Sequence, residues 1–160
     1  MQMRHTLTLS FILTAAICFS GCAKNKMVKG DIPLTTIPAG TFIEPPAEFS
    51  AIFQPVLFDY DRSDVRKDME TQLISLSEWL SSHPAVLLRV EGHCDERGSN
   101  EYNLALGERR ALSIRKFLSD QGVSAARIST ISYGEERPAN STHDEFAWAQ
   151  NRRGEFKVSQ

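Results

Sequence analysis

The 160-residue sequence has few cysteines, almost no net charge and no apolar run long enough to span a bilayer as a helix. Of its three cysteines, Cys18 and Cys22 lie in or directly after an apolar segment near the N-terminus, which leaves Cys94 for the folded part. A single thiol cannot form an internal disulfide, so we expect the fold to be held by its core. The 18 basic and 20 acidic residues give a net charge of −2, which argues against nucleic acid as a partner.

The N-terminus has the layout of a secretory signal peptide. A basic segment precedes the apolar run of residues 7–19, and small residues and Cys22 follow it. The run is shorter than the roughly 20 residues of a transmembrane helix, so we expect residues 1–21 to be a signal peptide rather than a permanent anchor. An ordinary signal peptide cut near Ala15 or Gly21, with Cys22 incidental, is the alternative.

The placement Ser20-Gly21-Cys22 resembles the bacterial lipobox. This resemblance implies that Cys22 is lipidated and becomes the first residue of the mature chain. Phe19 stands where lipoboxes prefer leucine, and Ala23 is unlike the aspartate that usually retains lipoproteins in the inner membrane. Delivery to the outer membrane is therefore implied, with acyl chains as the anchor.

A tether is expected to follow. Residues 23–50 show no periodicity and contain four prolines and two glycines, a composition typical of extended linkers. About 28 residues at about 3.3 Å each reach at most about 90 Å. We therefore expect a lipidated N-terminus and flexible tether over residues 22–50 and one domain over residues 51–160, with the alternative that Thr41–Phe49 packs on the domain as a strand or arm.

The domain alternates strand and helix signals. Met69, Leu73, Leu76 and Leu80 recur at spacings of four, three and four, which puts them on one face of a helix that ends at Pro84. Period-two alternation then predicts a strand with one buried face, and this face includes Cys94. Together the patterns predict seven elements: strand 52–58, helix 69–83, strand 86–94, helix 99–122, strand 127–133, helix 145–153 and strand 155–158.

This alternation predicts an α/β (α+β) sandwich of βαβαβ type, in which helices cover one mixed sheet. The helix after Gly98 has Ser99 or Asn100 as its candidate N-cap and Gly122 as its candidate C-terminal glycine. Its core stripe is expected to consist of Leu104, Gly107, Ala111, Ile114 and Leu118.

A candidate binding site lies where the strand ending near Cys94 leads into this helix. Asp95 stands at the exit of the strand, while Asn103, Leu106 and Arg110 are spaced by three and four along a second face of the helix. A carboxylate, a guanidinium and the free N–H groups of a helix N-terminus suit a zwitterion. The alternative is a structural ion pair between Asp95 and Arg110, with Asn103 merely solvated.

The segment GHCDERGSNEYNLALGERRA, residues 92–111, resembles the signature of the OmpA-like peptidoglycan-binding domain family. The motifs at residues 58–61 (FDYD), 132–134 (SYG) and 151–153 (NRR) match the family in the same order. The sequences DERG and EYN-x-x-LGERRA resemble those of the peptidoglycan-associated (Pal-type) lipoproteins more than those of porin-linked members. The resemblance covers the chain from about Val56 to its end.

Carried over residue by residue, the resemblance implies that Asp95 and Arg110 hold the diaminopimelate of the wall's stem peptide. The residues implied to line or frame the same groove are Asn103, Leu106, Arg97, Tyr102, Phe58, Asp59, Asn151 and Arg152. It also implies TolB and the Tol machinery as partners, a role in envelope integrity and cell division, and a periplasmic domain anchored to the outer membrane. Cys94 replaces the usual alanine or threonine, so a buried core residue is favoured over an oxidisable thiol beside the site.

Catalytic and metal-binding roles have little support in the sequence. A metal site at His93, Cys94 and Asp95 is disfavoured because neighbouring strand residues point to opposite faces and no second ligand cluster has zinc spacing. Neither the Gly-x-Ser-x-Gly elbow nor the His-Glu-x-x-His motif of hydrolases occurs. We therefore expect binding without turnover, no cofactor and no metal. The open alternatives are an OmpA-like envelope lipoprotein outside the Tol system, a periplasmic enzyme and a structural module without a ligand.

Overall fold

The computed structural model describes residues 41–159, so the expected signal peptide, Cys22 and the tether up to residue 40 lie outside this range. Short 3₁₀ turns precede β2, α1 and β4. Within residues 41–159, no helix is long and apolar enough to cross a membrane. The strands and α-helices occur in the order β1 (Phe42–Ile43), β2 (Val56–Leu57), α1 (Glu70–Ser82), β3 (Leu88–His93), α2 (Asn100–Asp120), β4 (Ile128–Gly134), α3 (Glu145–Asn151) and β5 (Arg153–Ser159).

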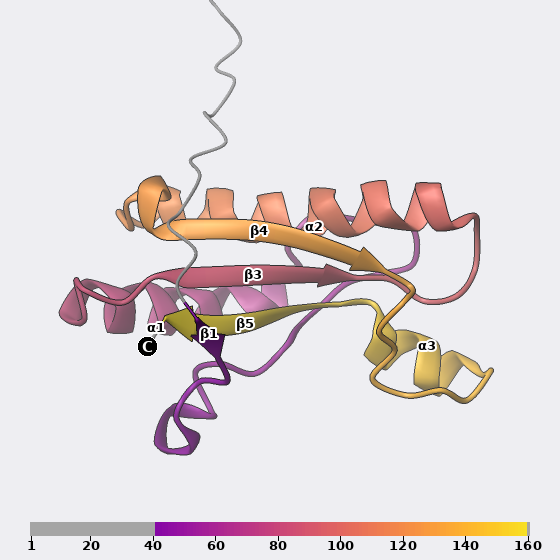
Figure 1. Ribbon diagram of the computed structural model, residues 1–160, viewed down its shortest axis with the longest axis horizontal. Helices are drawn as coiled ribbons and strands as arrows, with labels where there is room; N and C mark the ends of the chain where they lie inside the picture. Colours follow the sequence, from indigo (N-terminus) through magenta and orange to yellow (C-terminus); the bar gives the residue numbers. More distant parts are fainter. Residues whose placement is uncertain (1–40, 160) are drawn as a thin grey trace, which may run out of the picture. The chain divides into compact units, whose positions relative to one another are not determined.

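The strands form one mixed sheet. Its order is β1-β5-β3-β4, and β2 also pairs with β5. β3 is parallel to β4 and antiparallel to β5, while β1 and β2 run antiparallel to β5. Helices α1 and α2 pack on one face of this sheet (Figure 1). The predicted α/β sandwich, with one mixed sheet covered by helices, is confirmed.

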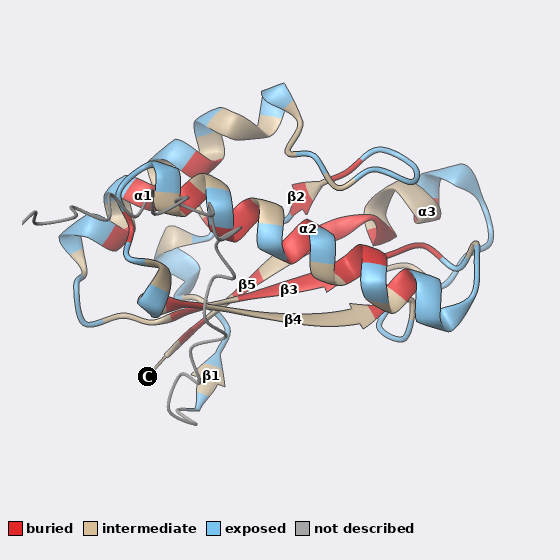
Figure 2. Cartoon of the chain, turned by 90° about the horizontal axis from the view of Figure 1, so that it is seen from above, coloured by how far each residue is buried: buried red, intermediate tan, exposed pale blue. Residues whose placement is uncertain are grey.

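One apolar core fills the space between the sheet and these two helices. Leu73, Leu76 and Leu80, the stripe predicted from their spacing, are fully buried. Figure 2 shows that α2 is buried where it meets the sheet and exposed on its outer side, as an amphipathic helix should be. The partners in the core come from β3, α2 and β5: Leu88, Val90, Ala111, Ile114, Leu118 and Phe156.

The strand predicted for residues 52–58 was too long, because only Val56–Leu57 pairs in the sheet. Residues before it form a turn in which the N–H of Phe53 donates to the carbonyl of Phe49 over 3.3 Å. Pro55 has no N–H for a sheet hydrogen bond. The apolar side chain of Phe53 reaches the core from this turn, and its hydrophobicity therefore misled the strand prediction.

The segment before this turn is the arm that the sequence left open as an alternative to a tether. Phe42 and Ile43 pair with Ser159 and Val158 at the end of β5. The guanidinium of Arg89 lies 4.7 Å from the centre of the Phe42 ring. Phe42 and Ile43 therefore add a short strand to the sheet.

The expectation that β3 has a single buried face was wrong. Glu91 and His93 point away from α2, yet they are only 3% and 1% exposed. β3 lies between β4 and β5, and side chains from both neighbours cover it: the Tyr133 ring stacks on His93 with 5.5 Å between ring centres. Burial, together with the charge of Arg153, lowers the pKa of His93 to about 4, so its imidazole is neutral at neutral pH.

A pair of glycines sets the distance between α2 and the sheet. A Cβ placed on Gly92 of β3 would lie 1.9 Å from the carbonyl oxygen of Gly107 of α2. A Cβ on Gly107 would lie 2.3 Å from the Oγ of Ser132 on β4. The backbone of a packed helix cannot move aside as a flexible side chain can, so this contact requires glycine.

We expect Gly92→Ala to lower the free energy of unfolding by about 2–3 kcal/mol, because the added methyl group forces α2 away from β3. Urea denaturation followed by circular dichroism measures this loss. Gly122→Ala is the matched control: Gly122 has a φ of +97° but nothing within 4 Å of a Cβ, so only backbone strain of about 1 kcal/mol is expected. Equal losses in the two variants would contradict the role of the glycine contact.

Candidate functional site

The turn from β3 into α2 brings the predicted site residues together. Gly98, with a φ of +119°, reverses the chain, and Ser99 caps α2 by accepting a 3.2 Å hydrogen bond from the N–H of Tyr102. The cap confirms the first of the two candidates from the sequence. Because β3 and α2 are joined by this short turn, Asp95 and the first two turns of the helix face one space.

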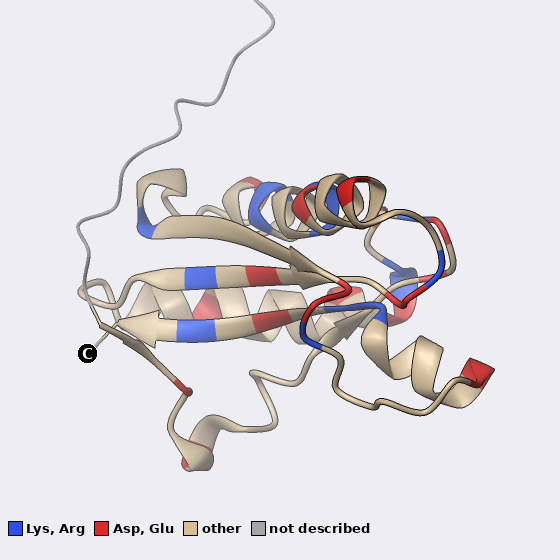
Figure 3. Cartoon of the chain, turned by 45° about the vertical axis from the view of Figure 1, so that its right-hand side comes forward, with Lys and Arg blue, Asp and Glu red and all other residues tan. Residues whose placement is uncertain are grey.

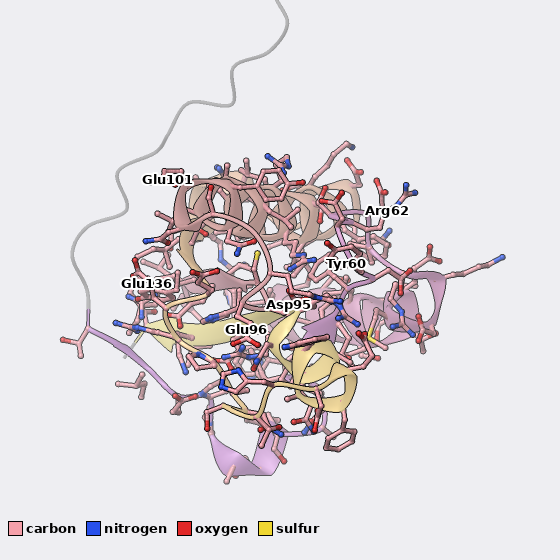
Figure 4. All side chains as sticks on the ribbon, turned by 90° about the vertical axis from the view of Figure 1, so that its right-hand side faces the viewer. Tyr60, Arg62, Asp95, Glu96, Glu101 and Glu136 are labelled. Carbon is pink, nitrogen blue, oxygen red and sulfur yellow. The ribbon has the colours of Figure 1, made fainter. Side chains whose placement is uncertain are left out.

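That space is a cavity of about 250 Å³ at one end of the domain. Figure 4 views this end, with Tyr60, Asp95 and Glu96 labelled near its centre. Six of the predicted site residues line it: Asp95, Arg97, Tyr102, Asn103, Leu106 and Arg110. The other lining residues are Tyr60, Asp61, Cys94 and Gly98.

Asp95 is buried and paired with two arginines. Its Oδ2 accepts from Nη2 of Arg97 at 2.6 Å and from Nη1 of Arg152 at 3.2 Å, while its Oδ1 accepts from the N–H and the Nε of Arg97, both at 3.1 Å. Burial by itself raises the pKa of this carboxyl, but the hydrogen bonds from Arg97 and Arg152 outweigh it and the pKa is lowered. No ion pair joins Asp95 to Arg110 within residues 41–159, so the structural pair offered as an alternative does not form.

Arg110 is fully buried, and backbone carbonyls hold its guanidinium. Its Nε donates to Arg62 at 2.9 Å, its Nη1 to His93 at 2.8 Å and its Nη2 to Asp59 at 3.2 Å. Nη1 also donates to the Sγ of Cys94 at 3.3 Å. Four of the five N–H groups are thereby used, which leaves one on Nη2 without a partner in the described part of the chain. Burial lowers the pKa of Arg110, although its guanidinium stays charged.

Asn103 fixes the wall of the cavity between these two charges. Its amide donates to the carbonyls of Asp95 and Arg97 at 3.2 and 3.3 Å and to Oε2 of Glu135 at 2.5 Å. The solvated Asn103 of the alternative is therefore not observed, since the residue is only 1% exposed. Leu106, one turn later, is buried and gives the cavity an apolar surface.

The rim of the cavity is aromatic and acidic. Tyr60 and Tyr102 are among the exposed large side chains of the described residues. The guanidinium of Arg97 lies 4.1 Å from the centre of the Tyr60 ring, and the hydroxyl of Tyr102 donates to Asp61. Asp61, which also lines the cavity, has a φ of +53°, a conformation that non-glycine residues seldom adopt.

Four predicted residues do not line the cavity, and three of them lie next to residues that do. The Phe58 ring lies 5.2 Å from the guanidinium of Arg110, and Asp59 contributes its carbonyl rather than its carboxylate. Arg152 donates a hydrogen bond to Asp95, which does line the cavity. Asn151 lies apart, where its Oδ1 accepts from the N–H groups of Ala139 and Asn140 and holds that loop.

The sequence prediction missed Tyr60 and Asp61 as lining residues. Both belong to the FDYD motif at residues 58–61, whose first two members were chosen instead. The motif itself was the available signal. Without the turn geometry after β2, the sequence did not indicate which of its four side chains face the helix.

Cys94 is a buried core residue beside the cavity, as expected. It is 2% exposed, and its thiol donates to the carbonyl of Asn103 at 3.2 Å. Burial raises the pKa of the thiol to about 11.

We expect Cys94 to react slowly with iodoacetamide at pH 8, because with a pKa of about 11 only about one thiol in a thousand is ionised. Peptide mass spectrometry after timed labelling measures the rate at this position alone. The same chain unfolded in guanidinium chloride is the control and should be labelled at the rate of a free cysteine. Equal rates for the folded and unfolded chains would show that the thiol is accessible and activated.

The cavity therefore combines a buried guanidinium, two carboxylates, an apolar wall and an aromatic rim. A guanidinium attracts a carboxylate, and carboxylates attract an ammonium group. The volume of about 250 Å³ admits a group of amino-acid size. These features suit a small zwitterionic ligand.

Comparison with known proteins gives consistent matches. The model of the OmpA family matches residues 57–152. A peptidoglycan-associated lipoprotein of Mesorhizobium japonicum is 42% identical over 149 residues, which cover 92% of this chain and 89% of that protein. The crystal structure of the peptidoglycan-associated lipoprotein from Burkholderia pseudomallei has a TM-score of 0.65 at 40% identity, covering 66% of this chain and 90% of that one. The C-terminal domain of Helicobacter pylori MotB, 22% identical, shares the fold with a TM-score of 0.63 over 67% of this chain and 84% of its own.

Proposed function

The chain belongs to the OmpA family, and we propose that it is an outer-membrane lipoprotein that binds peptidoglycan non-covalently and has no enzymatic activity. The similarity to peptidoglycan-associated lipoproteins extends over nearly the whole chain and so includes the segment before the domain. Lipid on Cys22 would hold the N-terminus in the outer membrane. The domain would then hold the wall, and the chain between them would join the two layers.

The cavity at the β3–α2 turn is the proposed wall-binding site, with the diaminopimelate of the stem peptide as ligand. The observation that carries this proposal is the buried Arg110 in a cavity that also holds Asp95 and Asp61. The carboxylate of diaminopimelate would meet Arg110 and the N–H groups that begin α2. Arg110 would act through its charge and its remaining Nη2 N–H, because its other N–H groups are already bonded.

The ammonium group of the ligand requires a free carboxylate oxygen. Both oxygens of Asp95 are engaged, but its two arginine partners differ in mobility, because the side chain of Arg97 is 29% exposed and that of Arg152 only 9%. We propose that the ammonium group replaces Arg97 at Asp95 while Arg152 stays. This exchange keeps a cation beside the buried carboxylate throughout, so no uncompensated charge is created.

Sedimentation with isolated sacculi tests the site. We expect Asp95→Ala and Arg110→Ala each to abolish nearly all pelleting, because each leaves the opposite charge of the ligand unpaired at a cost of about 3–5 kcal/mol. Asp120→Ala is the matched control, since Asp120 lies at the far end of α2 in an exposed pair with Lys116. This variant should pellet like the parent chain.

Because Arg110 is buried, a loss of binding must be separated from a loss of folding. Circular dichroism melts should show a folded domain for every variant compared. Arg110→Lys keeps the charge but cannot reach the same carbonyls, and we expect weak binding from a folded protein. If folded Asp95→Ala and Arg110→Ala chains pellet as completely as the parent, the peptidoglycan site is not in this cavity.

We further propose that the protein acts with TolB and the Tol machinery in envelope integrity and cell division. The similarity to peptidoglycan-associated lipoproteins supports this partner. A pull-down from solubilised envelopes with the tagged full-length chain should recover TolB. Recovery of wall fragments without TolB would favour the alternative, an OmpA-like envelope lipoprotein outside the Tol system.

A further inference from the structure

A second cluster of polar side chains lies on the opposite face of the sheet from α2. Glu91 and His93 alternate along β3, and Glu155 is the direct cross-strand partner of Glu91 on β5. Each of the three residues offers one ligand atom, and these atoms all lie within 4.8 Å of one another. Figure 3 shows the acidic bands of β3 and β5 side by side. Two carboxylates and one imidazole therefore meet at one point of the sheet.

The imidazole of His93 lacks a partner there. The residue is 1% exposed, and neither Nδ1 nor Nε2 has a hydrogen bond within residues 41–159. Buried ring nitrogens are nearly always paired with protein or with an ordered group, because water is no longer available to them. An unpaired imidazole within reach of two carboxylates thus points to a ligand that accepts electron pairs from both kinds of group.

We propose that Glu91, His93 and Glu155 bind a divalent transition-metal ion of the Zn²⁺ or Mn²⁺ class. Imidazole suits zinc and its neighbours, and carboxylates suit manganese and zinc. Ligand atoms about 2.1 Å from a common ion lie about 3.4 Å apart in tetrahedral geometry, so these side chains would need to close by up to about 1.4 Å. Glu155 has the freedom for this movement because its side chain is 27% exposed.

The carboxylates are oriented in the way that metal ligands usually are. Oε1 of Glu91 accepts a hydrogen bond from Nε of Arg89 at 2.9 Å and forms an ion pair with Nη2 of Arg89 at 2.7 Å, and its Oε2 has no partner among the described residues. Oε1 of Glu155 accepts from Nε of Arg153 at 2.7 Å, and its Oε2 lies 3.7 Å from Nζ of Lys157. One oxygen of each carboxylate is thus fixed by an arginine, while the other is left for an ion.

The two glutamates attract a cation, whereas the neighbouring basic side chains repel one. Like charges directly opposite each other on neighbouring strands repel and destabilise the pairing. Arg89 and Lys157 form a second like-charged pair one step along the same strands. A divalent cation between Glu91 and Glu155 would turn the first repulsion into two attractive contacts. The nearby arginines and lysine oppose this by their own charge, so we expect a site that chelators can empty.

The proposed site differs from the sequence expectation of no metal. The sequence argument considered ligands adjacent to His93 along the chain, whereas Glu155 is brought there only by the pairing of β3 with β5. Cys94 and Asp95, the neighbours considered earlier, point to the other side and line the ligand cavity. The proposed metal site is therefore separate from the proposed peptidoglycan site.

Isothermal titration calorimetry tests the proposal. The full-length chain in detergent is first stripped of metal with EDTA and then titrated with Zn²⁺ or Mn²⁺. We expect one equivalent of Zn²⁺ or Mn²⁺ to bind and to raise the melting temperature. Glu91→Gln, His93→Gln and Glu155→Gln should each weaken binding about tenfold or more. Glu155→Gln is the variant least disposed to unfold, because its side chain is the most exposed of the three.

His143→Ala is the matched control. His143 and Glu96 form an exposed pair at 2.7 Å, which is another place where a histidine and a carboxylate meet. This variant should bind metal like the parent. Nuclear magnetic resonance gives a direct readout: the imidazole signals of His93, and not those of His143, should shift when metal is added. No binding by the parent chain, or unchanged binding by folded Glu155→Gln and His93→Gln chains, would overturn the proposal.

Discussion

The buried guanidinium of Arg110 joins three parts of the fold that are distant in sequence. It lies on α2 and donates to His93 at the end of β3 and to Asp59 and Arg62 in the loop after β2. A charge with no water around it is tolerated only when its donors are paired, so these carbonyls and Arg110 require one another. The same contacts give the ligand cavity its positive charge. Stability and the proposed binding thus depend on one side chain.

The end of β3 has a separate role on each of its faces. Gly92 lets α2 approach the strand, while the carbonyl of His93 holds Arg110 and the ring of His93 faces Glu91 and Glu155 on the other side. Asp95, two residues later, begins the cavity wall. Any ion bound by the His93 ring would therefore limit the movement of the carbonyl that positions Arg110.

Local signals predicted the parts of the fold and site that lie close together in the chain. Ser99 and the glycine after α2 mark the ends of that helix by their capping chemistry, and Asp95, Asn103 and Arg110 share a cavity because one turn joins their elements. Arg152 and Glu155 could not be placed in this way, since strand pairing brings them to Asp95 and Glu91 across more than fifty residues. The length of β2 was overestimated because apolar residues in a turn have the same composition as a strand.

The arm formed by β1 has a mechanical consequence for a protein proposed to connect a membrane to a wall. A pull on the chain that precedes residue 41 enters the fold at Phe42, which is held by only two residue pairs to the end of β5. β3, by contrast, is bonded to strands on both sides. The arm should peel away first and release about 35 Å of chain, at about 3.3 Å per residue, before the load reaches Phe53, whose side chain lies in the core. The released arm would lengthen the connection under tension, while the part of the domain that forms the proposed ligand site stays folded.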